Sequence, residues 1–292
     1  ASDVYKRQKE DDIVSYKIVI DSCGEFLEEW KDNTGFESVP LVLTVGNEDI
    51  VDDSSFNQAE FLKKVAQCPD CPKSACPSPE RYRQAFDCEA DHVYGVTLSA
   101  ELSGSYNSAI LGKNLLHEEH PDKKIHIFNS RSASIGETLI AMKIEECEKA
   151  GLPFETVVDV VEHYIETQNT YFVLENLETL RKNGRLSNVK AFVASALKIK
   201  PVMGATPEGT ICQLGQARGM NKALVKMVEH IVAGAADSEN RVLAISHCNC
   251  PERAEMLKEA LLEKIKPARV VVLDTAGVSS MYANDGGIIV AV

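Results

Sequence analysis

The stretch HVYGVTLSAELSGSYNSA, residues 92–109, joins a β-rich apolar run to a hydroxyl-rich turn and the start of a helix. Short continuous apolar runs such as residues 92–98 are typical of strands that are buried on both faces of a parallel sheet. The spacing of Tyr106, Ile110 and Leu115 predicts a helix over residues 103–117. A strand that passes directly into a helix is the first part of a βαβ unit.

The rest of the first half repeats this alternation. Strands are predicted at residues 16–20, 38–45 and 124–128, and helices at residues 57–67, 134–150 and 154–167. Strands and helices that alternate over short loops favour a parallel sheet with helices on both faces. We therefore expect residues 13–167 to form an α/β domain with three layers, α/β/α.

The second half has a different pattern. Residues 199–204 and 210–217 predict two strands around the turn Pro207-Glu208-Gly209, which makes an antiparallel pair. Further strands are predicted at residues 171–174, 242–247, 269–273 and 288–292, and helices at residues 176–182, 188–197, 220–235 and 251–265. We expect residues 168–292 to form a smaller α/β domain with a mixed sheet. Residues 1–12 are polar and without a period, and we expect a non-native or disordered leader there.

Charge and cysteine usage narrow the class of protein. The formal net charge is −13, and no run of lysine and arginine interrupts the sequence. Nucleic acids and anionic membranes are polyanionic and need basic patches, so we expect neither as a partner. No apolar run approaches the ~18 residues of a membrane span. The nine cysteines are interpreted as reduced thiols, which predicts a cytoplasmic protein without membrane insertion.

The turn over residues 99–105 is the first candidate site. Ligands of open α/β sheets bind beyond the carboxyl ends of the strands, and a helix that begins there offers unpaired N–H groups. That arrangement suits a carboxylate or a phosphate, with a dipole contribution of about 0.3–1 kcal/mol. The alternative is that Ser103 serves only as the N-cap of the helix.

A second hydroxyl-bearing segment is KSACPSPERY, residues 73–82. Pro79 suits the first turn of a helix, and Ser78 suits its N-cap. By itself this segment is an ordinary helix start. It contributes to a binding site only if the fold brings it to the turn at residues 99–105.

Five segments carry a resemblance to the DegV family of fatty-acid-binding (FakB) proteins. Residues 74–79, SACPSP, resemble the family's Thr-Ser-Gln-Pro-Ser-Pro, and residues 99–106, SAELSGSY, resemble its Ser-x-x-Leu-Ser-Gly-Thr-Tyr. Residues 21–23, DSC, are similar to its Asp-Ser-Thr. Residues 177–185, LETLRKNGR, and 197–201, LKIKP, are similar to its Leu-x-x-Leu-x-x-Gly-Gly-Arg and Leu-x-Ile-Lys-Pro. The five segments occur in the family's order, and the resemblance covers residues 16–292.

The resemblance implies a carrier that holds one long-chain fatty acid in a buried apolar cavity and is not itself an enzyme. Ser74 and Ser103 would bind the carboxylate, with Gly104 and Ser105 beside them. A fatty acid kinase subunit would then convert the presented carboxyl group to an acyl phosphate for phospholipid synthesis, with Arg185 facing that partner. No cofactor and no metal are implied. Burying ~14 methylenes at ~0.8 kcal/mol each contributes about 11 kcal/mol before ordering costs, so the tail dominates affinity.

The last family motif departs from the pattern. The family often has His-Thr-Gly-Pro-Gly near the C-terminus, with the histidine close to the carboxylate. Residues 277–287 correspond to it, and Ala283 stands in the histidine position. Ser279, Ser280 or Asn284 are the alternatives for a polar contact with the head group.

Two other functions remain open from the sequence. Cys68, Cys71, Cys76 and Cys88 include one CxxC pair, and a closed four-cysteine zinc site would fit a zinc-containing sensor of small anions. A serine hydrolase acting on an acyl ester would use Ser103 as nucleophile and His247 as base. The Gly-x-Ser-x-Gly motif of the α/β-hydrolases is absent from the sequence.

Overall fold

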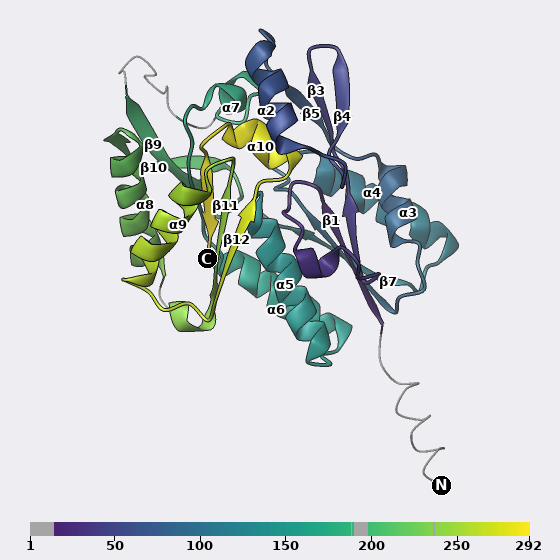
Figure 1. Ribbon diagram of the computed structural model, residues 1–292. Helices are drawn as coiled ribbons and strands as arrows, with labels where there is room; N and C mark the ends of the chain where they lie inside the picture. Colours follow the sequence, from purple (N-terminus) through teal and green to yellow (C-terminus); the bar gives the residue numbers. More distant parts are fainter. Residues whose placement is uncertain (1–14, 188, 190–197, 236) are drawn as a thin grey trace.

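The computed structural model describes residues 15–187, 189, 198–235 and 237–292. It contains a four-stranded sheet, a six-stranded sheet and a three-stranded sheet (Figure 1). The leader predicted over residues 1–12 lies outside the described residues, as does the helix predicted over residues 188–197 apart from Val189. None of the helices in the described part of the chain combines the length and apolar character needed to cross a bilayer.

The four-stranded sheet is parallel throughout, in the order β2-β1-β6-β7. Its strands are β1 (Tyr16–Asp21), β2 (Phe36–Val39), β6 (His92–Thr97) and β7 (Lys124–Asn129). Neighbouring residues of one strand point to opposite faces, so Val19 and Val93 join one apolar cluster while Ile18 and Tyr94 join another. Both faces are therefore buried, as the continuous apolar runs predicted.

Helices cover the two faces in pairs. α3 (Pro79–Phe86) and α4 (Ser105–Glu119) cover one face, and α5 (Ile135–Lys149) and α6 (Phe154–Thr167) cover the other. The predicted start of α3 is confirmed, because the Ser78 side chain accepts a hydrogen bond from the Arg81 N–H and Pro79 occupies the first turn. The three-layer α/β/α arrangement predicted for the first part of the chain is confirmed.

The six-stranded sheet is mixed, in the order β10-β9-β8-β13-β11-β12. Only β11 and β12 pair in parallel. The strands are β8 (Thr170–Val173), β9 (Ile199–Ala205), β10 (Ile211–Arg218), β11 (Val242–His247), β12 (Arg269–Asp274) and β13 (Ile288–Ala291). The predicted mixed sheet and its antiparallel β9–β10 pair are confirmed. All six strands follow residue 168, and the domain boundary placed there stays a prediction.

Helix α5 lies between the two large sheets. α8 (Met220–Gly234) and α9 (Pro251–Leu262) cover the outer face of the mixed sheet, and α5 packs against β11 and β13 on its inner face. Ala244, Val271 and Ala291 of the mixed sheet accordingly belong to the same apolar cluster as Ile18 and Leu139. One apolar core is therefore shared by the two halves of the molecule, and Figure 1 shows α5 between the two large sheets.

The structure corrects one predicted strand. Residues 38–45 are not continuous, because Pro40 separates β2 from β3 (Val42–Val45), which belongs to a different sheet. Proline lacks the N–H that a central strand needs, so the chain changes sheets there. β3 pairs antiparallel with β4 (Glu48–Val51) and with β5 (Lys73–Ala75). The sequence analysis did not predict this small sheet.

Short helices surround the small sheet at one end of the molecule. α2 (Gln58–Gln67) was predicted, and the side chain of Asn57 caps it. α7 (Glu178–Lys182) lies within a predicted helix, whereas α10 (Gly277–Ala283) was not predicted. α10 contacts both α2 and α7 (Figure 1). The remaining short elements are the 3-10 turns Glu28–Trp30 and Ser238–Asn240.

Candidate functional site: an apolar cavity between the sheets

A cavity lies where the two large sheets and the small sheet meet. It encloses about 840 Å³ of space free of protein atoms, part of it open to solvent. The lining comes from both halves of the chain, including Leu41 and Leu98 from the first half and Phe172 and Ile289 from the second.

The wall of the cavity is mainly aliphatic, and most of its polar groups are already paired within the protein. Ser132 Oγ lies 2.6 Å from Thr170 Oγ1. Ser134 Oγ donates to Glu25 Oε1 over 2.7 Å, and Ser279 Oγ donates to the Cys23 carbonyl over 2.9 Å. Hydroxyls that are satisfied in the wall do not require a polar ligand beside them. The apolar lining includes Leu102, Phe172, Leu174, Leu180, Ile211 and Ile289.

The two hydroxyl-bearing segments singled out from the sequence meet at this cavity. Ser74 on β5 and Ser103 in the turn before α4 both line it. The segments are in contact, because a Cβ atom on Gly104 would lie 3.1 Å from Cys76 Sγ. The small sheet brings this about, since β5 pairs with β3 and thereby carries Ser74 over the carboxyl end of the parallel sheet.

Arg185 lies at the same end of the cavity. Its Nε donates to the carbonyl of Leu102 over 3.2 Å, directly beside Ser103. Its guanidinium carbon is 5.9 Å from the centre of the Tyr282 ring, at cation–π distance. Ser74, Ser103, Arg185 and Tyr282 are all half-buried, so this end of the cavity is polar and close to solvent.

Ser103 does not act as the N-cap of α4. The helix begins at Ser105, its N-cap is Gly104, and no side chain caps it. The Ser103 hydroxyl instead accepts a hydrogen bond from the Ser105 N–H over 3.2 Å. The Ser105 side chain is fully buried and does not line the cavity.

The three residues offered as substitutes for the missing histidine do not lie together. Ser279 lines the cavity, but Ser280 and Asn284 do not. Ser280 Oγ is 2.7 Å from Thr275 Oγ1, and Asn284 Nδ2 donates to the Tyr282 carbonyl over 3.0 Å. Ala283 itself lines the cavity, so at this position the protein presents a methyl group.

Sequence analysis missed Tyr282, whose ring and hydroxyl belong to the polar end of the cavity. The signal was present, since Val278, Met281 and Tyr282 have helical spacing and pack in one apolar cluster. α10 is short, and its first N–H groups are capped from far along the chain. Asp52 accepts the N–H groups of Gly277 and Val278, each over 2.8 Å.

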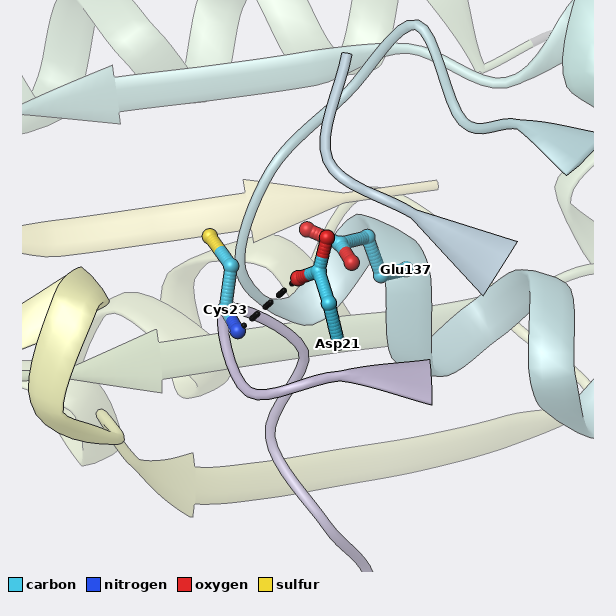
Figure 2. Close-up of side chains that lie close together, drawn as sticks. All are labelled: Asp21, Cys23 and Glu137. Carbon is cyan, nitrogen blue, oxygen red and sulfur yellow. Dashed lines mark hydrogen bonds between the residues drawn. The ribbon is translucent and has the colours of Figure 1, made fainter. Parts of the chain in front are cut away.

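Buried carboxyl groups gather behind the cavity wall. Asp21, Glu25 and Glu137 are at most 2% exposed. Burial raises the pKa of Glu25 to about 7 and raises the pKa of Glu137 well above its usual range, with the charge of Asp21 adding to the shift at Glu137. Burial likewise raises the pKa of Asp52 to about 6. Figure 2 shows the carboxyl groups of Asp21 and Glu137 turned toward each other.

The structure supports neither alternative function. The one group of three potential metal ligands found among the described residues is Asp21, Cys23 and Glu137, so Cys68, Cys71, Cys76 and Cys88 do not converge. For the hydrolase, His247 is absent from the lining that contains Ser103. Its Nδ1 accepts the Cys250 N–H over 3.4 Å instead.

Comparison with known proteins connects this architecture to relatives. A model of the DegV family, described as uncharacterised proteins, matches residues 15–292. A DegV domain-containing protein of Streptococcus gordonii is 36% identical over 280 residues, covering 94% of this chain and 98% of that protein. The crystal structure of a DegV family protein from Ruminococcus gnavus ATCC 29149, refined with vaccenic acid, has a TM-score of 0.93 at 56% identity, covering 96% of this chain and all of that one.

A third relative is similar along its whole length. The Streptococcus pneumoniae fatty acid kinase B3 protein, loaded with linoleic acid, has a TM-score of 0.86 at 33% identity. The match covers 95% of this chain and 98% of that one. The family model, the sequence relatives and the solved structures agree over nearly the whole chain, and the chain therefore belongs to the DegV family.

Proposed function

We propose that the protein binds one long-chain fatty acid in the cavity and presents its carboxylate to a partner kinase. The observation that carries this proposal is the meeting of Ser74, Ser103 and Arg185 at one end of an otherwise apolar cavity. An apolar space with a few convergent polar groups at one end matches an amphiphile with one charged head group.

The acyl chain supplies most of the affinity in this proposal. Each buried methylene contributes ~0.8 kcal/mol, and the aliphatic wall has few unpaired polar atoms to oppose it. The relatives from Ruminococcus gnavus and Streptococcus pneumoniae carry vaccenic acid and linoleic acid, and both are similar over nearly their full length. Their ligands support an unbranched C18 acid as the occupant here.

The polar end orients the head group. Ser103 Oγ accepts the Ser105 N–H and donates to Ser105 Oγ over 3.2 Å, and its hydroxyl proton can rotate from Ser105 to a bound carboxylate. Arg185 adds a fixed positive charge, and charge-assisted bonds to a carboxylate are about twice as strong as neutral ones. Because these side chains are half-buried, the carboxyl group stays within reach of a partner. The protein then supplies position, and the kinase with its ATP supplies the chemistry in the cytoplasm.

A reconstituted acyl-transfer assay tests this function. Delipidated protein is loaded with oleic acid and incubated with a fatty acid kinase subunit and ATP, and acyl phosphate is trapped with hydroxylamine. Product that requires all three components is expected. Tight binding without acyl phosphate would overturn the presenting role, and hydrolysis of an acyl ester by the protein alone would replace the carrier with an enzyme.

A further inference from the structure

The buried carboxyl groups behind the cavity are not explained by ligand binding. Glu137 on α5 is fully buried. Among the described residues, no N–H or O–H group donates a hydrogen bond to either of its side-chain oxygens. An isolated ionised carboxylate in such a place is very costly, so a group of this kind acquires a cation, a donor or a proton. The question is which of these Glu137 holds.

Asp21 has a carboxyl oxygen within 4.8 Å of one of Glu137, and its own oxygens already accept hydrogen bonds. Asp21 Oδ2 accepts the Leu98 N–H over 2.8 Å, and Oδ1 accepts the Cys23 N–H over 3.1 Å. These two donors favour the ionised form of Asp21. Figure 2 shows the Glu137 carboxyl group directed at this carboxylate.

A metal ion is the alternative occupant, because one donor atom each of Asp21, Cys23 and Glu137 lies within 4.8 Å of the other two. Burial raises the pKa of the Cys23 thiol, which favours the protonated thiol over the thiolate that binds metals. The Cys23 thiol lies beside Glu137 and is a weak donor to its carboxyl group. Cys23 Sγ also accepts the Ser134 N–H over 3.4 Å.

We propose that Glu137 is a neutral carboxylic acid in the folded protein and donates its proton to Asp21, and that this pair positions the turn carrying Ser103. One proton satisfies Glu137 as a donor and leaves the pair with a single negative charge. The raised pKa of Glu137, caused by burial and by the charge of Asp21, agrees with this assignment.

Asp21 contacts the residues that flank the turn on both sides. Leu98, held by Asp21, is the last residue before the turn. Ser105 lies at the other end of the turn, and a hydrogen bond from its side chain to Asp21 favours the ionised carboxylate. Ser103 Oγ in turn donates to Ser105 Oγ over 3.2 Å, which links Ser103 to the pair. A second charge on Glu137 would repel Asp21 and disturb both anchors. The inference therefore deepens the proposed function, because it assigns a positioning role beside the carboxylate site.

The surroundings of the pair contain further groups that titrate. The side chains that act on Asp21 or Glu137 from other elements come from the segment after β1, from the loop before α2 and from α3. They are Cys23, Glu25, Asp52 and Tyr82. Burial raises the pKa of each of them. All four are acids that are either neutral or anionic, so none supplies a positive charge to the pair.

Infrared spectroscopy and pH-dependent melting test the protonation without any ligand. At pH 8, where Glu25 and Asp52 are mostly ionised, we expect a carboxylic-acid carbonyl band. This band should disappear in Glu137→Gln and remain in the exposed control Glu263→Gln. Glutamine cannot bind the extra proton. The melting temperature of the wild type relative to Glu137→Gln should therefore fall as pH rises from about 5 to about 8. The absence of this infrared band would overturn the proposal, as would a difference in melting temperature that does not change with pH. A stoichiometric metal ion that is present in the wild type and lost in Glu137→Gln would also overturn it.

The positioning role rests on the proposed function and needs fatty acid. Glutamine can still donate to Asp21, whereas leucine cannot. Oleic acid should bind Glu137→Gln within about twofold of wild type and Glu137→Leu about tenfold more weakly, the effect of losing one hydrogen bond to a charged group. Equal affinity of the two variants would overturn the positioning role. If the infrared band is present but no variant binds fatty acid, the proposed function fails and the proton pair stands.

Discussion

The hydroxyl of Ser74 lies 3.3 Å from the hydroxyl of Tyr282, which joins β5 of the small sheet to α10 near the C-terminus. The two residues are 208 positions apart in the chain. Their contact closes the polar end of the cavity, because Tyr282 also lies under the guanidinium of Arg185. The head-group site is thus assembled from both halves of the protein.

Removing both serine hydroxyls should weaken head-group binding without unfolding the protein. In Ser74→Ala with Ser103→Ala the acyl chain keeps its apolar contacts, so the Kd for oleic acid should rise about tenfold, as for losing one or two hydrogen bonds to a carboxylate. Acyl transfer to the kinase should fall further, because orientation is lost. Ser108→Ala, on α4 but outside the lining, is the matched control. Unchanged transfer in the double variant would count against both serines.

Tyr282→Phe separates the hydroxyl from the ring. The variant loses the contact with Ser74 but keeps the aromatic face for Arg185. We expect the free energy of unfolding to fall by about 1 kcal/mol and fatty-acid affinity to change little, as for one neutral hydrogen bond. Tyr106→Phe on α4 is the control in chemical denaturation. A large loss of affinity in Tyr282→Phe would instead make the Tyr282 hydroxyl a direct ligand of the carboxylate.

Filling the cavity should prevent binding. Ala205 at the end of β9 lines the cavity, and a phenyl ring there would occupy the space of the acyl chain. Ala205→Phe should therefore co-purify with little or no fatty acid while melting close to the wild type. Val225→Phe adds the same ring at a side chain that is 61% exposed on α8 and should retain ligand. Full occupancy in Ala205→Phe would place the acyl chain elsewhere.

Stability should decrease as pH rises from about 4.5 to about 7. Burial raises the pKa of Glu25 from 4.5 to about 7, so between these values the folded protein binds a proton that the unfolded chain has released. Stability from this group is present below about pH 4.5 and is lost as pH approaches about 7, on the order of 3 kcal/mol in total. Glu25→Gln should flatten this part of the pH profile of urea unfolding. If the free energy of unfolding of Glu25→Gln fell as steeply with pH as that of the wild type, the assignment of this pH dependence to Glu25 would be contradicted.

Local signals predicted the regular elements well. Ser78 and Pro79 mark the start of α3 because a cap and a first-turn proline act within one turn of the chain. The strand over residues 38–45 was wrong because a strand-like composition does not reveal that Pro40 divides it between two sheets. β5 has only three residues, and its pairing with β3 depends on contacts that no periodicity encodes.

The site was predicted only in part, because local motifs could be recognised and contacts between distant segments could not. Ser74, Ser103 and Arg185 were found through motifs, and the fold brings them to one cavity. Their roles in binding stay predictions. α10 was missed although Val278, Met281 and Tyr282 have helical spacing, and its cap, Asp52, could not be predicted because it lies more than two hundred residues away. The pairing of Glu137 with Asp21 also joins distant segments, and nothing local to Glu137 marks it as buried without a donor.

Mass spectrometry of the ligand released from the denatured protein tests the central claim most directly. The protein is purified without added lipid from a host that makes long-chain fatty acids, and the organic extract is quantified against the protein. We predict about one long-chain fatty acid per chain, with free carboxyl group, and its absence from Ala205→Phe. An empty cavity, or a phosphate or other nonlipid anion in its place, would contradict a fatty-acid carrier.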